Sequence, residues 1–226
     1  KYKKGKNHVV TEEPLELKTD DQSYACVTKL LGHGRVHCNV YSVELIDGSP
    51  SFKANERLGI IRGAMRRKKQ WIKSGDIVNI DVTVIKGGYH GDTSRMYYVG
   101  EAPIQAKRLC EITYESMWRG IEEIKPNKHL GDIGYAIQSF AENLGCSVVK
   151  EFCGHGIGTK FHDDPQVLHY GSAGTGLQLK AGMIFTVEPM INAGKASIRQ
   201  MADGWTIVTK DHSLSAQWEH TVLVTD

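Results

Sequence analysis

The spacing of apolar and polar residues changes along the chain and predicts two differently built segments. In the first third, runs rich in β-branched and aromatic residues predict strands at residues 24–31, 35–46 and 57–62. Turn-forming residues separate these runs, namely Gly32-His33-Gly34 and Asp47-Gly48-Ser49-Pro50. Short strands without long helices are typical of a small barrel or sandwich.

The remaining two thirds mix helical and strand patterns. Residues 76–85 and 89–99 flank Lys86-Gly87-Gly88, which is a β-hairpin signal. Apolar residues recur at helical spacing over residues 106–124 and 130–144. Four strand-like runs follow, at residues 147–152, 183–190, 205–209 and 217–225. This mixture predicts an α+β fold.

The composition is that of an ordinary soluble protein, because 40% of the 226 residues are hydrophobic and 24% are charged. No run approaches the ~18 apolar residues that a membrane span needs, and the basic start lacks the apolar part of a signal peptide. The five cysteines are dispersed without CxxC spacing, which favours reduced thiols. We therefore expect a cytoplasmic protein without a membrane partner.

Charge divides the chain in a similar way. Residues 1–75 hold 15 Lys and Arg against 8 Asp and Glu, whereas residues 76–226 hold 13 against 18. Residues 1–21 are basic and show no strand or helix pattern, so we expect a flexible tail there. A basic first third and an acidic remainder suggest different binding partners.

Two aspartates on the predicted hairpin are candidate metal ligands. Asp81 lies in NIDVTV and Asp92 in HGDTS, on opposite arms. A turn centred between Lys86 and Gly87 places them directly opposite, with Cβ atoms about 4.5–5.5 Å apart. Carboxylates this close on a buried face repel each other unless a proton or a cation is bound. Taken alone, such a pair is more often two exposed strand acids.

Three further residues make a metal site the better interpretation. His155 lies between glycines in CGHGIG, where the backbone can approach a ligand closely. Glu188 in FTVEPM and Glu219 in SAQWEHT are carboxylates in strand-like runs, where an unpaired charge is costly. Four carboxylates and one imidazole suit paired ions such as Mn²⁺, Fe²⁺ or Co²⁺. Two such ions about 3.5–4 Å apart can activate water for hydrolysis.

The motifs around these residues resemble those of type I methionine aminopeptidases. The resemblance covers residues 74–226 and runs through NIDVTVIKGGYHGDTSRMYYVG, CGHGIGTKFHDDPQVLHY, GMIFTVEPMINAG and DGWTIVTKDHSLSAQWEHT. It implies a partial pita-bread fold, as in creatinases and aminopeptidases. It also implies an enzyme that removes the methionine at the N-terminus of a peptide or nascent chain. It also implies two divalent metal ions (Co, Mn, Fe or Zn).

The same resemblance implies a role for each matching residue. The complete set of metal ligands would be Asp81, Asp92, His155, Glu188 and Glu219. Among them, Asp92 and Glu219 would bridge the two ions, and Glu188 would also transfer protons. His162 would contact the substrate and stabilise the tetrahedral intermediate, while Phe161 and Trp205 would form walls of the methionine pocket.

The family's second substrate histidine has no counterpart here, because its position falls at Gly63 in IIRGAMRRKKQWIKSGD. This segment and QSYACVTKLLGHGRVHC resemble translation initiation factor 1A of eukaryotes and archaea. The resemblance covers residues 1–78 and implies a partial OB-type β-barrel at residues 22–73 that binds RNA or the small ribosomal subunit. The implied phosphate and stacking contacts are Arg62, Arg66, Arg67, Lys68, Lys69 and Trp71.

The two resemblances meet around residues 71–78, and each covers only part of its family's fold. The sequence therefore predicts a chimera of two partial modules, because natural fusions usually keep domains whole. Three functions stay open: an aminopeptidase with impaired turnover, an RNA-binding protein, or a chain with neither activity. We favour the aminopeptidase because all its metal ligands are present, whereas residues 1–75 supply only about three of five barrel strands. We expect these strands to form an open sheet, and the strand beginning at Asp76 to pair within the aminopeptidase hairpin.

Overall fold

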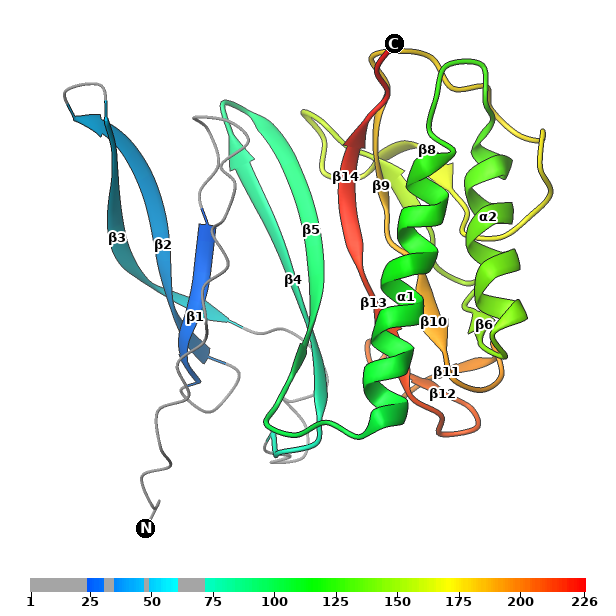
Figure 1. Cartoon of the computed structure of the whole chain (residues 1–226), viewed down its shortest axis with the longest axis horizontal. Coiled ribbons are helices and arrows are strands. Elements are labelled where there is room, and N and C mark those ends of the chain that lie inside the picture. Colours follow the sequence, from blue (N-terminus) through cyan, green and yellow to red (C-terminus); the bar gives the residue numbers. More distant parts are fainter. Residues whose placement is uncertain (1–23, 31–34, 47–48, 61–71) are drawn as a thin grey trace. The chain divides into compact units, whose positions relative to one another are not determined.

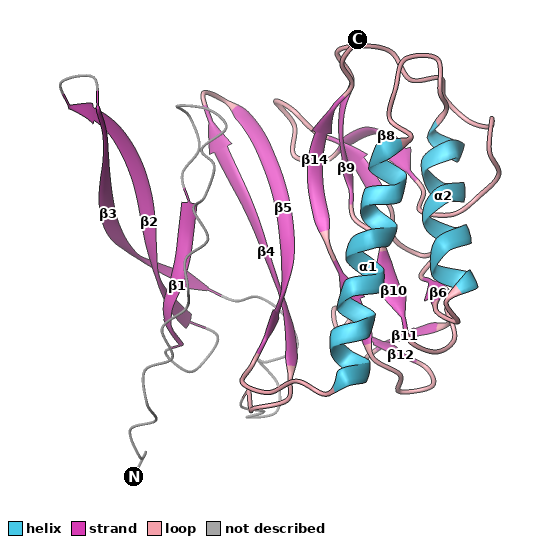
Figure 2. Cartoon of the chain, in the orientation of Figure 1, coloured by secondary structure: helices cyan, strands magenta, loops and turns pink. Residues whose placement is uncertain are grey.

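The computed structural model describes the backbone of residues 24–30, 35–46 and 49–60 and the whole of residues 72–226. The chain divides into two compact units, Lys1–Lys69 and Gln70–Asp226. Figure 1 labels their helices and strands, and Figure 2 shows how helices, strands and loops are distributed.

The first unit contains one antiparallel sheet of three strands in the order β1-β2-β3. Their bounds are Tyr24–Leu30 for β1, Arg35–Ile46 for β2 and Ser49–Ile60 for β3. The predicted three-stranded sheet is confirmed, but the strand limited to residues 57–62 is wrong. Ser49 and Pro50 were expected in a turn, yet they already pair with β2. The predicted tail at residues 1–21 and the turn at Gly32-His33-Gly34 lie outside the described residues.

The second unit opens with the predicted hairpin, β4 (Ile77–Lys86) and β5 (Tyr89–Tyr98). Its turn consists of Gly87 and Gly88, whose φ angles of 57° and 86° belong to a primed turn that requires positive φ at both positions. Lys86 therefore pairs with Tyr89. As expected, the strand that begins after Asp76 pairs within this hairpin.

The register of the hairpin corrects one prediction. A turn centred one residue further along the chain places Asp81 opposite Ser94, and Asp92 opposite Thr83. The two aspartates are thus diagonal neighbours rather than directly opposite. They still share a face, because residues two positions apart on a strand point the same way.

The two predicted helices are confirmed as α1 (Ile104–Glu122) and α2 (Leu130–Asn143). Buried positions on α1 recur at helical spacing, including Leu109 and Met117, and they pack with Ile133 and Ile137 of α2 in one apolar core. The helices lie side by side against strands of the second unit (Figures 1 and 2).

The other strands of the second unit are short: β6 (Ser147–Val148), β7 (Gly154–Gly156), β8 (Asp163–Val167), β9 (Ile184–Val187), β10 (Met190–Asn192), β11 (Ile198–Gln200), β12 (Ile207–Thr209), β13 (Ser215–Gln217) and β14 (Glu219–Leu223). The largest sheet has the order β4-β5-β14-β9-β7-β8, and the smaller sheets are β13-β10-β6 and β11-β12.

Two predicted runs turn out to be two strands each. Residues 183–190 form β9 and the first residue of β10, with a break at Glu188-Pro189. Residues 217–225 form the last residue of β13 and then β14, with a break at Trp218. In both cases the chain passes from one sheet to another. Strands β7, β8 and β11 were not predicted, because three to five residues carry too little alternation to be recognised. None of the described helices is both long and apolar enough to cross a bilayer.

Candidate metal centre

The five predicted metal ligands lie on five neighbouring strands of the six-stranded sheet. Asp81 lies on β4, Asp92 on β5, and Glu219 begins β14; Glu188 directly follows β9, and His155 is the middle residue of β7. These strands are consecutive in the sheet. All five residues line one cavity of about 580 Å³.

The alternation of side chains explains why the ligands share one face. Phe185 and Val187 of β9 are fully buried in the core that the helices complete, so Thr186 and Glu188 point to the opposite face. On β14, Glu219 likewise faces the cavity, whereas the next residue, His220, contacts Trp118 of α1. His220 is thus placed apart from the site.

Three of the ligands already form a compact group. Asp92, His155 and Glu219 each offer one ligand atom, and these atoms lie within 4.8 Å of one another. Glu188 adjoins the group, since its Oε1 lies 3.6 Å from His155 Nε2. Asp81 also lines the cavity, close enough to Asp92 for their charges to interact.

Burial and mutual repulsion raise the pKa values of three carboxyl groups. The pKa of Glu219 rises to about 10, first because of burial and then because of the charges of Glu188, Asp92 and Asp81. Burial also raises the pKa of Glu188 to about 7. Desolvation, with a smaller effect of the Asp92 charge, raises the pKa of Asp81 to about 6. Such an array is stable near neutral pH only when protons or cations compensate the charges.

One buried carboxylate oxygen shows that the array fits a cation. Glu219 is 1% exposed, and its Oε1 has no hydrogen-bond partner among the described residues. A buried acceptor without a partner costs free energy, which a bound cation would offset. Four carboxylates and one imidazole form the donor set that divalent ions such as Mn²⁺ and Co²⁺ prefer.

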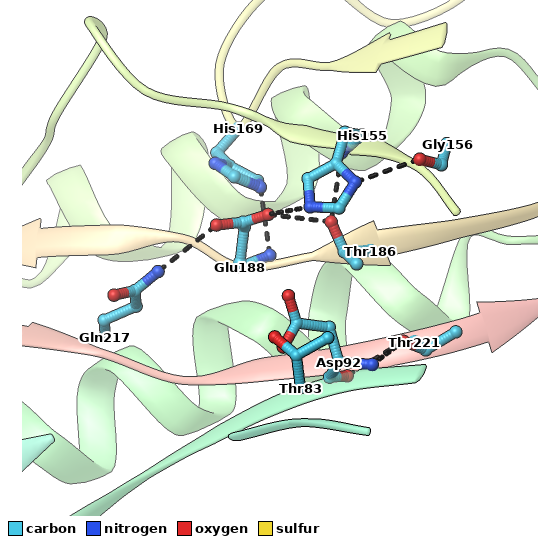
Figure 3. A network of polar contacts seen from close by, with 9 residues as sticks. All are labelled: Thr83, Asp92, His155, Gly156, His169, Thr186, Glu188, Gln217 and Thr221. Atoms are coloured by element: carbon cyan, nitrogen blue, oxygen red, sulfur yellow. Dashed lines mark hydrogen bonds and ion pairs between the residues drawn. The ribbon is translucent and has the colours of Figure 1, made fainter. Parts of the chain in front are cut away.

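His155 presents a free lone pair to the cavity. Its Nδ1 lies 2.9 Å from the carbonyl oxygen of Gly156. A carbonyl only accepts, so Nδ1 carries the proton and Nε2 keeps the lone pair that a metal ligand needs. Figure 3 shows this contact beside Glu188.

The glycines around His155 are required by the packing of the neighbouring strands. A Cβ at Gly154 would collide with the carbonyl of Thr186, and a Cβ at Gly156 would collide with the carbonyl of Asp164. The glycines therefore allow close packing of β7 between its neighbours β9 and β8. This packing fixes the backbone of His155.

Glu188 is held at both carboxylate oxygens and at its amide (Figure 3). The hydroxyl of Thr186 donates to Oε1 at 2.7 Å, and the amide of Gln217 donates to Oε2 at 3.3 Å. The backbone N–H of Glu188 donates to Nε2 of His169 at 3.1 Å. His169 is 1% exposed, and burial lowers its pKa to about 3, so it stays a neutral acceptor.

Asp92 is held by two threonines. Thr83, its cross-strand partner, donates to Asp92 Oδ1 at 2.9 Å. Thr221 accepts from the Asp92 N–H at 2.9 Å and donates to the Asp92 carbonyl at 2.8 Å. These contacts anchor the aspartate to β4 and β14. Together with His169, Thr186 and Gln217, these threonines were missed, since the sequence alone does not show which polar strand residues face a ligand.

The predicted substrate residues divide into two groups. Phe161 and His162 line the cavity, and their rings lie 4.0 Å apart between centroids. Burial lowers the pKa of His162, with a smaller effect of His155. The structure does not bring Trp205 to this cavity: it is 70% exposed and absent from the lining. The lining also includes Phe152, Cys153 and Met190, which the sequence did not indicate.

The residues proposed to contact RNA cannot be placed. Arg62, Arg66, Arg67, Lys68, Lys69 and Trp71 lie outside the described residues, as does Gly63. The contacts to RNA therefore stay a prediction.

A centre rich in carboxylates that lines a cavity is typical of metal-dependent hydrolases. The chain belongs to metallopeptidase family M24, whose sequence profile matches residues 22–226. Methionine aminopeptidase of Escherichia coli (strain K12) is 61% identical over 155 residues, which cover 69% of this chain and 59% of that protein. The enzyme of Rickettsia prowazekii (strain Madrid E) is 62% identical, with 68% of this chain and 60% of that protein covered.

Solved structures agree with the fold. A crystal structure of methionine aminopeptidase from Rickettsia prowazekii aligns at a TM-score of 0.67 and 53% identity, covering 82% of this chain and 68% of that chain. The pita-bread fold of family M24 is thereby confirmed for the part that aligns. The OB-type barrel is not confirmed, and the family match includes the segment from residue 22 that resembles initiation factor 1A.

The chain spans about three fifths of the length of the curated relatives it matches.

Proposed function

We propose that this chain is a two-metal aminopeptidase that hydrolyses the peptide bond after an N-terminal methionine. The observation that carries the proposal is the convergence of Asp81, Asp92, His155, Glu188 and Glu219 at one cavity. The relatives named above are methionine aminopeptidases, which supports the same substrate class. Two divalent ions held by these five residues would polarise the peptide carbonyl and lower the pKa of the attacking water.

Glu188 is the residue proposed to move the proton. Glu188 lines the cavity, and a carboxylate placed there can both take and release a proton. Thr186 and Gln217 hold its two oxygens, so the carboxylate is oriented before substrate arrives. Glu188 would take a proton from the attacking water and pass it to the leaving amine.

His162 is proposed to stabilise the charge that develops on the substrate carbonyl. It is exposed at the cavity and stands beside Phe161 and His155. Donors of this kind are typically worth about 10²–10³ in rate. Phe161, Phe152, Cys153 and Met190 would surround the methionine side chain with apolar and sulfur-containing groups.

Turnover is expected to be weak, because Gly63 stands where the family's second substrate histidine is expected. Losing one such contact costs about 10²–10³ in rate. The direct test is cleavage of Met-Ala-Ser peptide by the metal-free chain before and after addition of Mn²⁺. Slow methionine release that depends on Mn²⁺ and stops with a chelator supports the proposal. No release, together with no Mn²⁺ binding, would contradict it.

Binding to RNA or the small ribosomal subunit through residues 1–75 is a second proposed function. It rests on the resemblance to initiation factor 1A and on the basic residues of this segment, including the run at residues 62–71. If it is correct, RNA affinity should fall steeply as salt rises, because released counterions drive such binding. Salt-insensitive or undetectable RNA binding would count against it. A cytoplasmic location stays a prediction from the dispersed cysteines.

A further inference from the structure

We propose that Thr186 is a positioning residue that couples two metal ligands, His155 and Glu188. Its hydroxyl oxygen accepts the backbone N–H of His155 at 3.0 Å and donates to Glu188 Oε1 at 2.7 Å. Figure 3 shows the side chain between the two ligands. The inference rests on the proposed function, since it concerns the binding of metal at the same centre.

The direction of each hydrogen bond follows from the chemistry of the groups. An amide N–H can only donate, and a carboxylate oxygen only accepts, so the single hydroxyl proton must point toward Glu188. The hydroxyl is therefore fully engaged by two ligands that lie 33 residues apart in the sequence. A displacement of either ligand would therefore alter the hydrogen bond that holds the other, because both bonds share the hydroxyl oxygen of Thr186.

The surroundings leave Thr186 little freedom to make other contacts. Its side chain is fully buried, at 0% exposure. Strands β7 and β9 pair at Gly156 and Phe185, and the backbone of Thr186 lies too close to Gly154 for any side chain there. The hydroxyl therefore bridges the two strands at fixed separation. Serine would supply the same hydroxyl, whereas valine would fill the same volume without it.

Removing the hydroxyl by Thr186→Val should weaken metal binding without leaving a cavity in the core. The His155 N–H and Glu188 Oε1 would each lose their partner, and the Glu188 carboxylate would be free to turn about its side-chain torsions. Partners that hold a metal ligand in this way are typically worth about 10–100-fold in metal affinity. The effect should appear in binding of the metal itself, independently of peptide turnover.

The matched control is Thr113, another fully buried threonine. Its hydroxyl donates to the Leu109 carbonyl within α1, and it has no contact with the cavity. Thr113→Val thus makes the same change in a buried site of the same unit. Its effect on metal affinity should be nil, whatever its effect on stability.

Isothermal titration of Mn²⁺ into the metal-free chain provides the test. We expect Thr186→Val to weaken Mn²⁺ binding about 10–100-fold, Thr186→Ser to stay within about threefold of the unchanged chain, and Thr113→Val to match it. If Thr186→Val does not fold, Thr186→Cys keeps a similar volume with a weaker donor and should show a smaller loss.

Two results would overturn the inference in distinguishable ways. Equal Mn²⁺ affinity in the unchanged chain and in Thr186→Val would remove the role of the hydroxyl while leaving the metal centre in place. Loss of affinity in Thr186→Ser as large as in Thr186→Val would show that any change at this position matters, not the hydroxyl. If the unchanged chain itself binds no Mn²⁺, the proposed function fails first.

Discussion

Asp81 and Asp92 lie diagonally across the β4–β5 hairpin, with Ser94 opposite the first and Thr83 opposite the second. The diagonal places a hydroxyl residue, Ser94 or Thr83, rather than an acid directly opposite each carboxylate. Thr83 donates to Asp92, so this aspartate is oriented by its own cross-strand neighbour. The arrangement keeps two charges on one face without direct stacking, while both reach the same cavity.

Replacing a bridging ligand should abolish binding of both metal ions. Asp92 and Glu219 belong to the tightest group of ligand atoms, so Asp92→Asn or Glu219→Gln removes charge where both ions would share it. Titration with Mn²⁺ measures the result. Glu111→Gln, on the exposed side of α1, serves as the control and should bind like the unchanged chain. Retention of one tight ion in both ligand variants would show that neither residue bridges.

The metal-free chain should become more stable as the pH falls from about 9 to about 7, because His169, which burial keeps neutral in the folded chain, opposes this trend only below about 6.5. The folded pKa values of Asp81, Glu188 and Glu219 are about 6, 7 and 10, above the ordinary 3.8 for aspartate and 4.5 for glutamate. Between the ordinary and the raised values the folded chain binds more protons than the unfolded chain. The free energy of unfolding therefore decreases as pH rises through this window.

Thermal unfolding in the presence of a chelator, followed across this pH range, checks the trend. Saturating Mn²⁺ should flatten it, because the cation then replaces the protons. A metal-free chain that loses stability steadily as the pH falls from about 9 to about 7 would show that the carboxyl groups are not confined together as described.

His162→Ala should lower the rate of methionine release by about 10²–10³ while leaving Mn²⁺ affinity unchanged. The reason is that His162 lines the cavity but does not belong to the compact ligand group. Peptide cleavage and Mn²⁺ titration on the same sample separate the two effects. A large loss of Mn²⁺ affinity would instead make His162 a metal ligand.

Two substitutions on α1 compare the loss of unfolding free energy at a buried and at an exposed apolar residue. Leu109 is 1% exposed and Ile104 is 82% exposed. Leu109→Ala should cost about 2–5 kcal/mol of unfolding free energy because it leaves a cavity in the core. Ile104→Ala should stay within about 0.5 kcal/mol. Denaturant titration measures both, and equal effects would contradict the placement of α1 against the sheet.

The sequence predicted the elements of the second unit better than their connections. Long periodic segments such as α1 and α2 were recognised because many positions repeat the same spacing. The breaks at Glu188-Pro189 and at Trp218 were missed, because one apolar run looks the same whether it stays in one sheet or crosses between two. These breaks adjoin Glu188 and Glu219, so they were missed where the cavity forms.

The sequence predicted the charged residues and the histidine of the candidate site but not the neutral residues that form hydrogen bonds with them. Asp92, His155 and Glu219 stand out because a charge or an imidazole is unusual in an apolar strand. Thr186 and Gln217 are ordinary strand residues until the pairing of β7 with β9 and of β10 with β13 places them against a predicted ligand. Register was the missing information, since a shift of one residue turns every side chain to the other face.

The most direct test of the two-metal centre is titration of Mn²⁺ into the metal-free chain, followed by electron paramagnetic resonance. Two ions about 3.5–4 Å apart couple magnetically, so we expect saturation at two ions per chain and a spin-coupled spectrum that loss of Asp92 or Glu219 abolishes. Saturation at one ion with an isolated six-line spectrum, or no saturable binding at all, would contradict the centre described above.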